Sequence, residues 1–105
     1  MGTVIAVDLG GTWTRAGVVA GDGRILAERT AATPQGGGGP GVITEGIASL
    51  VRDLLGSGYP SPKAIGISAA GPVDIRRGAL RNPPNLPFRD IPLVEPLATE
   101  FGLPV

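Results

Sequence analysis

The first thirty residues contain three stretches with the hydrophobic pattern of β-strands, separated by short turns. Alternating or continuous apolar positions predict strands over residues 3–9, 15–20 and 24–30. A Gly-Asp-Gly sequence at residues 21–23 is typical of a hairpin turn between the second and third strands. Because both connections are short, the three strands are expected to form an antiparallel meander.

The middle of the chain changes to a helical period and then returns to a strand. Hydrophobic residues recur at three- and four-residue steps between Ile43 and Leu54, which predicts an amphipathic helix. Pro40 near its first turn and Gly56 after its last apolar residue are favoured at these positions. Residues 63–70 predict a further strand, and the helix that precedes it favours a crossover that places it parallel to the first strand.

Glycines and prolines interrupt the last third of the chain. Residues 76–78 predict a second hairpin turn, and residues 82–87 predict an extended loop, because prolines prevent regular strand pairing. A last helix is expected over residues 92–101, with Asp90 as its N-cap. Residues 103–105 indicate the approach to another strand. This order predicts an α/β domain of ribonuclease-H-like topology, with a mixed sheet and helices packed on it.

The turn after the first strand carries the candidate chemistry. Asp8 ends the apolar run, and the glycines and hydroxyl of Gly10, Gly11 and Thr12 follow at once. Glycines permit a tight turn whose backbone N–H groups converge on an anionic oxygen. Asp8 is then placed to hold a hydrated divalent cation. A plain hairpin with a Gly-Gly turn explains the same residues, and this segment alone does not separate the two interpretations.

Two common phosphate-binding motifs, the Walker A loop and the dinucleotide-binding motif, are absent from this turn. No Gly-Lys-Ser/Thr follows the glycines, so the turn is not a Walker A loop, and the dinucleotide pattern G-x-G-x-x-G is absent. The four consecutive glycines at residues 36–39 lie in a segment, residues 34–41, that we interpret as a flexible connector without a chemical role.

The composition narrows the function classes further. Nine basic and nine acidic residues give a formal net charge of zero, which predicts no nucleic-acid or anionic-membrane partner. The chain has no cysteine and no histidine, so thiolate ligands, disulfides and histidine catalysis are excluded within it. No apolar run is long enough to span a bilayer, and a cytoplasmic location is expected.

Three segments together resemble the ROK family (repressor, open reading frame, kinase) of sugar kinases. Residues 8–15, Asp-Leu-Gly-Gly-Thr-Trp-Thr-Arg, resemble the first phosphate motif of that family. Residues 70–74, Ala-Gly-Pro-Val-Asp, resemble its Gly-Pro-Val-Asp element, and residues 82–87, Asn-Pro-Pro-Asn-Leu-Pro, resemble its Pro-Asn-Leu loop. Each motif is weak alone, but the three occur in the family's order and extend over most of the chain.

The resemblance implies a fold of two actin-like lobes with ATP and a sugar in the cleft between them. It implies that residues 1–105 form the N-terminal nucleotide- and sugar-binding lobe, and that a second lobe lies outside this chain. Gly10, Gly11 and Thr12 would contact the β- and γ-phosphates of ATP, and Asp8 would lie close to Mg²⁺ through water. The motif positions of Thr14 and Arg15 also match the cofactor-binding segment.

The resemblance also assigns a sugar side to the site. Gly71 and Pro72 would border the sugar pocket, with Asn85 nearby. Hydrogen bonding within a turn explains Asn82 and Asn85 equally well. Asp74 is expected to fix the hairpin that follows it rather than to contact substrate.

The catalytic base of the family is an aspartate that follows the last residues of this chain, so the chain contains no predicted catalytic residue. A zinc segment and a second phosphate loop also lie further on in the family. We therefore expect an ATP-dependent hexose or N-acetylhexosamine kinase as the full-length protein, and no turnover and weak nucleotide binding by this chain alone. Apolar surface exposed on an isolated lobe predicts self-association and a homo-oligomer.

Two other functions remain open. Some ROK proteins are sugar-responsive transcriptional regulators with a DNA-binding segment ahead of the sugar-binding lobes, and the intact Asp-x-Gly-Gly-Thr motif favours a kinase over these. A non-enzymatic, actin-like nucleotide-binding protein would share the first motif but not the segments at residues 70–74 and 82–87. The sequence does not identify the sugar, nor does it distinguish ATP from polyphosphate as donor.

Overall fold

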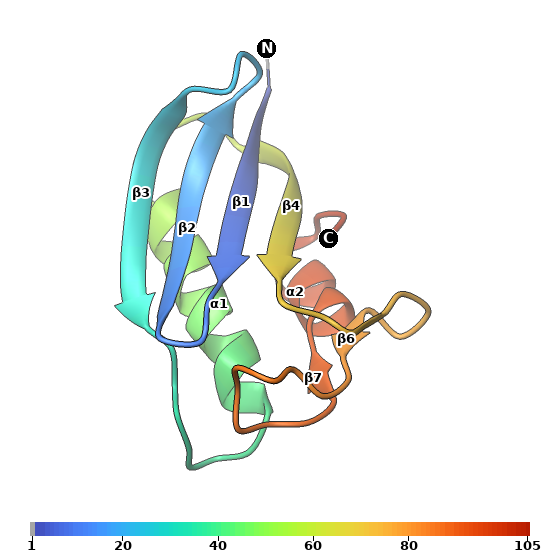
Figure 1. The fold of residues 1–105 in the computed structure, drawn as a ribbon. Coiled ribbons are helices and arrows are strands. Elements are labelled where there is room, and N and C mark those ends of the chain that lie inside the picture. Colours follow the sequence, from blue (N-terminus) through green and yellow to red (C-terminus); the bar gives the residue numbers. More distant parts are fainter. Residues whose placement is uncertain (1) are drawn as a thin grey trace.

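Four strands form the main sheet in a computed structural model that describes residues 2–105. Their order across the sheet is β3-β2-β1-β4 (Figure 1). The strands are β1 (Thr3–Leu9), β2 (Trp13–Ala20), β3 (Ile25–Ala32) and β4 (Pro62–Ala69). β1, β2 and β3 pair antiparallel, and β4 pairs parallel with β1. The predicted meander and the predicted parallel strand are therefore both confirmed.

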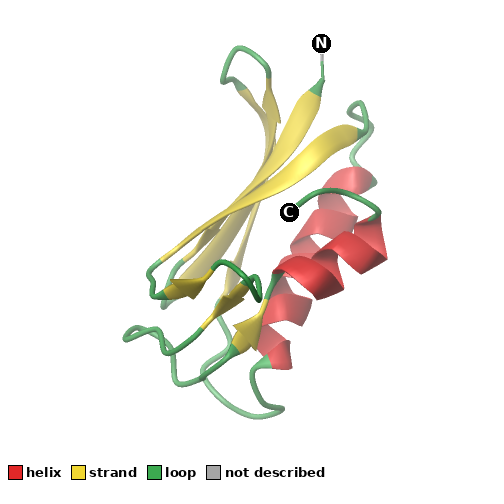
Figure 2. Cartoon of the chain, turned by 90° about the vertical axis from the view of Figure 1, so that its right-hand side faces the viewer, coloured by secondary structure: helices red, strands yellow, loops and turns green. Residues whose placement is uncertain are grey.

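Two helices cover one face of this sheet. α1 (Gly41–Leu55) and α2 (Val94–Phe101) lie side by side on that face (Figure 2). The strict alternation of β1 sends Ile5, Val7 and Leu9 toward the helices, where they are buried. Ile47 and other apolar residues of α1 complete the same core, as the helical period predicts. No helix within residues 2–105 is long and apolar enough to cross a membrane.

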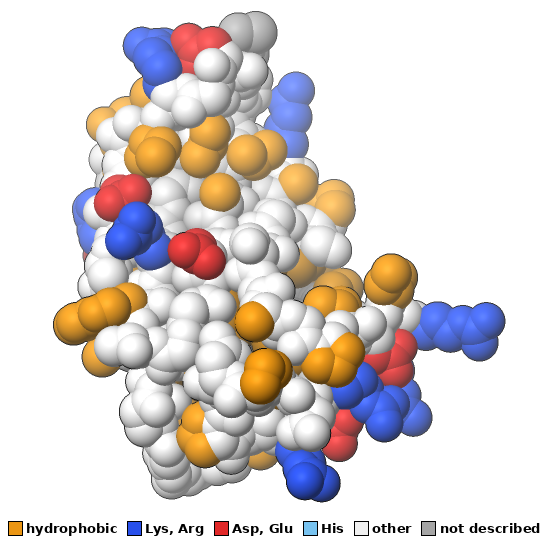
Figure 3. Space-filling view, viewed as in Figure 1, with side chains coloured by type: hydrophobic (Ala, Val, Ile, Leu, Met, Phe, Trp, Pro, Cys, Tyr) orange, Lys and Arg blue, Asp and Glu red, His pale blue; other side chains and the backbone are white. Residues whose placement is uncertain are grey.

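The opposite face of the sheet carries no helix. Val4, Ala6 and Asp8 of β1 point to this side and are exposed. Figure 3 looks onto this face, where hydrophobic side chains are scattered among backbone and uncharged polar side chains, with few acidic and basic side chains between them. This open face is the one on which the carboxylate of Asp8 is presented.

A small second sheet corrects the prediction for the last third of the chain. It consists of β5 (Val73–Asp74), β6 (Ala79–Leu80) and β7 (Ile91–Pro92), all antiparallel. The predicted hairpin is β5–β6, but β7 was not predicted. The expectation that Asp90 caps a helix starting at Pro92 is wrong. Asp90 has a φ of 51°, and its N–H donates to the carbonyl of Arg81, so it ends a loop and leads into β7.

The carboxylate of Asp74 organises the β5–β6 hairpin, as predicted. Its Oδ1 accepts a hydrogen bond from the backbone N–H of Arg77 at 3.2 Å, and its Oδ2 lies 3.5 Å from Nη1 of Arg81. The backbone hydrogen bond from Arg77, aided by the nearby guanidinium groups, outweighs the loss of solvation and lowers the pKa of Asp74. The ionised carboxylate therefore stabilises the hairpin.

Removing the Ile47 side chain tests the core. Ile47 is fully buried between α1 and the sheet, so Ile47→Ala is expected to lower the free energy of unfolding by about 2 to 5 kcal/mol. Ser49→Ala, on the exposed side of the same helix, is the control and should change it by no more than about 0.5 kcal/mol. Urea denaturation of both variants measures the difference, and equal effects would contradict this description of the core.

The lowered pKa of Asp74 predicts a pH dependence of stability. The folded state binds the proton less readily than the unfolded chain, so the charge contributes stability above the ordinary pKa of 3.8. This contribution declines as the pH falls through the lowered folded-state pKa. The stability gap between the native chain and Asp74→Asn should therefore narrow on acidification. A carboxyl ¹³C titration that places the midpoint of Asp74 at or above 3.8 would contradict this.

Candidate functional site

The turn between β1 and β2 is a tight hairpin connection. The N–H of Gly10 donates to the carbonyl of Trp13 at 3.0 Å, so Gly11 and Thr12 alone form the loop. A Cβ on Gly10 would lie 2.7 Å from that carbonyl oxygen, which leaves no room for a side chain. Steric exclusion of a side chain therefore explains why the turn begins with a glycine at residue 10.

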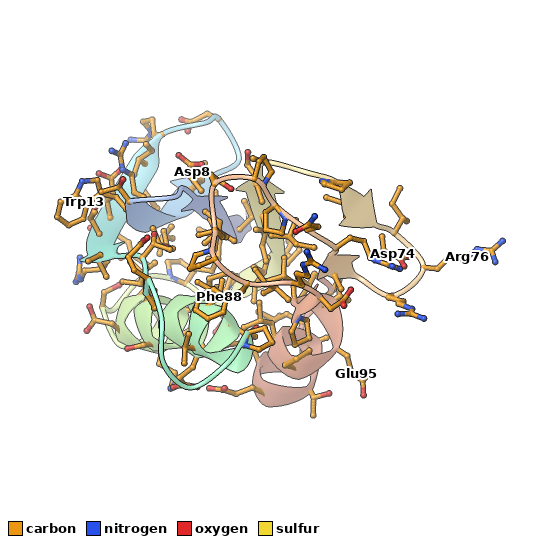
Figure 4. All side chains as sticks on the ribbon, turned by 60° about the horizontal axis from the view of Figure 1, so that its bottom comes forward. Asp8, Trp13, Asp74, Arg76, Phe88 and Glu95 are labelled. Atoms are coloured by element: carbon orange, nitrogen blue, oxygen red, sulfur yellow. The ribbon has the colours of Figure 1, made fainter. Side chains whose placement is uncertain are left out.

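Asp8 lies at the end of β1, on the open face of the sheet. It is in register with Arg15 on β2 and with Ser68 on β4. These three residues line a shallow depression of about 290 Å³, and no ion pair joins Asp8 to Arg15 within residues 2–105. Figure 4 shows Asp8 on the side of the sheet away from α1 and Trp13 projecting at the left of the view. The central strand therefore presents one carboxylate beside the glycine turn.

The loop over residues 82–87 packs against the same turn. A Cβ on Gly11 would lie 2.8 Å from the backbone oxygen of Asn85 and 3.2 Å from its Cβ. Three buried side chains anchor this loop to the rest of the protein: Pro83, Leu86 and Phe88. Asn85 itself is exposed. The predicted phosphate and sugar segments, 74 residues apart in sequence, are thus in contact.

Gly71 and Pro72 approach the same region from the end of β4. The carbonyl of Pro72 accepts a hydrogen bond of 3.1 Å from the N–H of Arg81, the residue before the loop that carries Asn85. Gly71 and Pro72 are both exposed. The structure therefore links the three motif segments into one corner of the molecule.

Thr14 is a predicted site residue whose side chain lies on the opposite face of the sheet from Asp8. Its side chain is 4% exposed on the helix-covered face, and its hydroxyl lies 2.8 Å from the hydroxyl of Thr33. Arg15, the next residue, points to the open face. Alternation along β2 separates these two motif positions onto opposite faces of the sheet.

Thr33 and Gln35 contact the turn and were missed in the sequence. The hydroxyl of Thr33 donates to the carbonyl of Gly10 at 2.8 Å, and Nε2 of Gln35 donates to the carbonyl of Gly11 at 2.6 Å. Gln35 belongs to the segment, residues 34–41, that we interpreted as a flexible connector without a chemical role, and this hydrogen bond shows that the segment is held against the turn at Gln35. The signal that could have identified Thr33 was the antiparallel pairing of β2 and β3. Because Trp13 pairs with Ala32, the next residue, Thr33, lies beside Thr12.

The residues around Asp8 are compatible with a metal ion that is coordinated mainly by water and by the phosphates of a bound nucleotide. No cluster of three or more His, Cys, Asp or Glu side chains occurs in the part of the chain that the structure describes. Mg²⁺ commonly keeps several waters and takes one or two carboxylates together with substrate phosphates. A single exposed carboxylate next to a glycine turn that is predicted to bind phosphate matches that pattern.

Comparison with known proteins gives the same fold over the whole chain. The glucokinase of Streptomyces coelicolor is 40% identical over 105 residues, which are all of this chain and 32% of the relative. The crystal structure of a ROK family glucokinase from Streptomyces griseus with glucose and AMPPNP is 38% identical, with a TM-score of 0.84 over 99% of this chain and 32% of that one. The ROK hexokinase of Thermus thermophilus is 36% identical, with a TM-score of 0.85 over 98% of this chain and 33% of that one.

This chain therefore spans about a third of the length of the relatives that it matches. The ROK family matches residues 4–105, which include β1 apart from Thr3, the glycine turn, the Gly-Pro-Val-Asp segment and the Asn85 loop. The fold, the motifs and this match agree with one another: the chain belongs to the ROK family.

Proposed function

We propose that the full-length protein is an ATP-dependent sugar kinase, and that this chain is its N-terminal lobe. The observation that carries the proposal is the contact between Gly11 and Asn85. The contact supports the proposal because a turn suited to phosphate lies against the loop that carries Asn85, so a phosphate donor and a sugar acceptor would meet at one corner. Phosphoryl transfer depends mainly on such positioning and on neutralisation of the phosphate charge.

The turn supplies the donor side. The N–H groups of Gly11 and Thr12 would bind the β- and γ-phosphates, and Asp8 would hold Mg²⁺ through water. The expectation for Gly10 is corrected, because its N–H already donates to the carbonyl of Trp13 and closes the turn. Arg15 lies in register with Asp8 and adds a positive charge on the same face. The complex of the Streptomyces griseus enzyme with AMPPNP supports ATP as the donor.

The loop and the end of β4 supply the acceptor side. The amide of Asn85 can both donate to and accept from sugar hydroxyls, and Gly71 and Pro72 would border the pocket. The glucose in the Streptomyces griseus structure makes glucose the first sugar to test. With Asp8 assigned to the metal, the base for the attacking hydroxyl is expected from the rest of the protein, so this chain alone should show no turnover.

A coupled assay on the complete protein tests the proposal. ADP release is measured over a panel of hexoses and N-acetylhexosamines with Mg²⁺, in the native protein and in Asp8→Ala. Because Asp8 would orient the hydrated metal, its loss is expected to lower kcat/KM by about 10- to 100-fold. The control is Asp22→Asn, in the turn between β2 and β3 at the far end of the sheet (Figure 1).

The outcomes separate the alternatives. Sugar-dependent ADP release that Asp8→Ala lowers by at least about tenfold and Asp22→Asn leaves unchanged supports the kinase. Sugar binding without ADP release would favour a regulator, and nucleotide-dependent filaments would favour an actin-like assembly protein. Either of these last results would overturn the proposal.

Gly11→Ala tests the contact between the two sides of the site. The added Cβ would meet a backbone oxygen at 2.8 Å, which cannot move aside without displacing the Asn85 loop. A displacement of this kind is expected to lower kcat/KM by about 100-fold. Gly66→Ala is the matched control, because a Cβ at this strand position meets no atom within 4 Å. Equal activity of the two variants would show that the contact is not needed.

A further inference from the structure

Three consecutive carbonyl groups of the glycine turn are held by one short segment after β3. The hydroxyl of Thr33 donates to the carbonyl of Gly10 at 2.8 Å, and the N–H of Thr33 donates to the carbonyl of Thr12 at 2.8 Å. Between them, Nε2 of Gln35 donates to the carbonyl of Gly11 at 2.6 Å and also to the carbonyl of Thr33 at 2.9 Å. The segment therefore contacts every peptide unit of the turn.

The hydroxyl groups of Thr14 and Thr33 form a directed chain. A threonine hydroxyl has one hydrogen to donate, and Thr33 gives its hydrogen to the carbonyl of Gly10. In the 2.8 Å contact with Thr33, Thr14 must therefore be the donor. Thr14 and Thr33 are 4% and 3% exposed, so water does not substitute readily for either bond.

These bonds determine where the N–H groups of the turn point. The one cis peptide bond among the described residues is Gly71–Pro72, so the peptides of the turn are trans. In a trans peptide the N–H points opposite to the carbonyl of the preceding residue. Fixing the carbonyls of Gly10 and Gly11 toward Thr33 and Gln35 therefore directs the N–H groups of Gly11 and Thr12 away from them. Neither N–H donates to a backbone carbonyl within residues 2–105.

We propose that Thr33 is a positioning residue of the nucleotide site. It holds the Gly10–Gly11 peptide so that the Gly11 N–H faces the nucleotide phosphate; Gln35 does the same for the Thr12 N–H, and Thr14 orients the Thr33 hydroxyl. This rests on the proposed kinase function. Glycines allow the peptide groups of the turn to rotate. The orientation of their N–H groups therefore has to be fixed by residues outside the turn.

The test uses three variants of the full-length protein. Thr33→Val keeps the shape but removes the hydroxyl, Thr33→Ser keeps the hydroxyl, and Thr44→Val is the matched control. Thr44 is also a buried threonine whose hydroxyl donates to a carbonyl, that of Pro92 in β7, and not to the turn. A general loss of stability should therefore appear equally in Thr44→Val.

Kinetics and binding give the first result. Thr33→Val is expected to raise KM for ATP by about tenfold, while Kd for the sugar alone stays within about twofold. Thr33→Ser should restore KM for ATP to within about threefold of the native value, and Thr44→Val should leave it unchanged. An unchanged KM in Thr33→Val, or an equal rise in Thr44→Val, would overturn the proposal.

Amide NMR gives a second result that does not need turnover. In Thr33→Val, without nucleotide, the Gly11 and Thr12 amide resonances should move and broaden, whereas in Thr44→Val they should stay at their native positions. Native positions of both amides in Thr33→Val would overturn the positioning role. Absence of sugar-dependent ADP release by the native protein would instead overturn the proposed function, and the amide shifts would still decide the role of Thr33.

Discussion

The position of β1 between an antiparallel and a parallel neighbour is the constraint on which the site depends. Its pairing with β2 closes the glycine turn, and its pairing with β4 brings the following segments to the same end of the sheet. Its alternation buries three apolar residues under α1 and leaves Asp8 on the other side. A shift of one residue in this register would bury the carboxylate and expose the core.

Local patterns were sufficient to predict the elements that this strand organises. Strand alternation, the Gly-Asp-Gly turn and the helical period between Ile43 and Leu54 are properties of neighbouring residues, and all reappear in the structure. β7 was not predicted because it is two residues long and one of them is Pro92. Asp90 resembled a helix cap in sequence, but its carboxylate lies 3.3 Å from Nε of Arg81 and its backbone turns toward β7.

The motifs of the candidate site could be recognised in the sequence, but the contacts between them in space could not be predicted. Asp8 and the glycines are neighbours in sequence, so their proximity needed no tertiary information. The contact of Gly11 with Asn85 joins segments 74 residues apart, and Gln35 acts through its side chain from a segment with a loop-like composition. The burial of Thr14 follows from strand alternation, but its hydrogen bond to Thr33 depends on where β3 ends.

Trp13 provides a fluorescent side chain next to the glycine turn. It is the one tryptophan of the chain, its side chain is 59% exposed, and its carbonyl receives the hydrogen bond that closes the turn. Indole emission responds to local polarity and to nearby charge, and here the emitting ring belongs to the residue that follows Thr12. The tryptophan fluorescence of this chain therefore originates entirely beside the turn, and the fold carries its own spectroscopic reporter at that point.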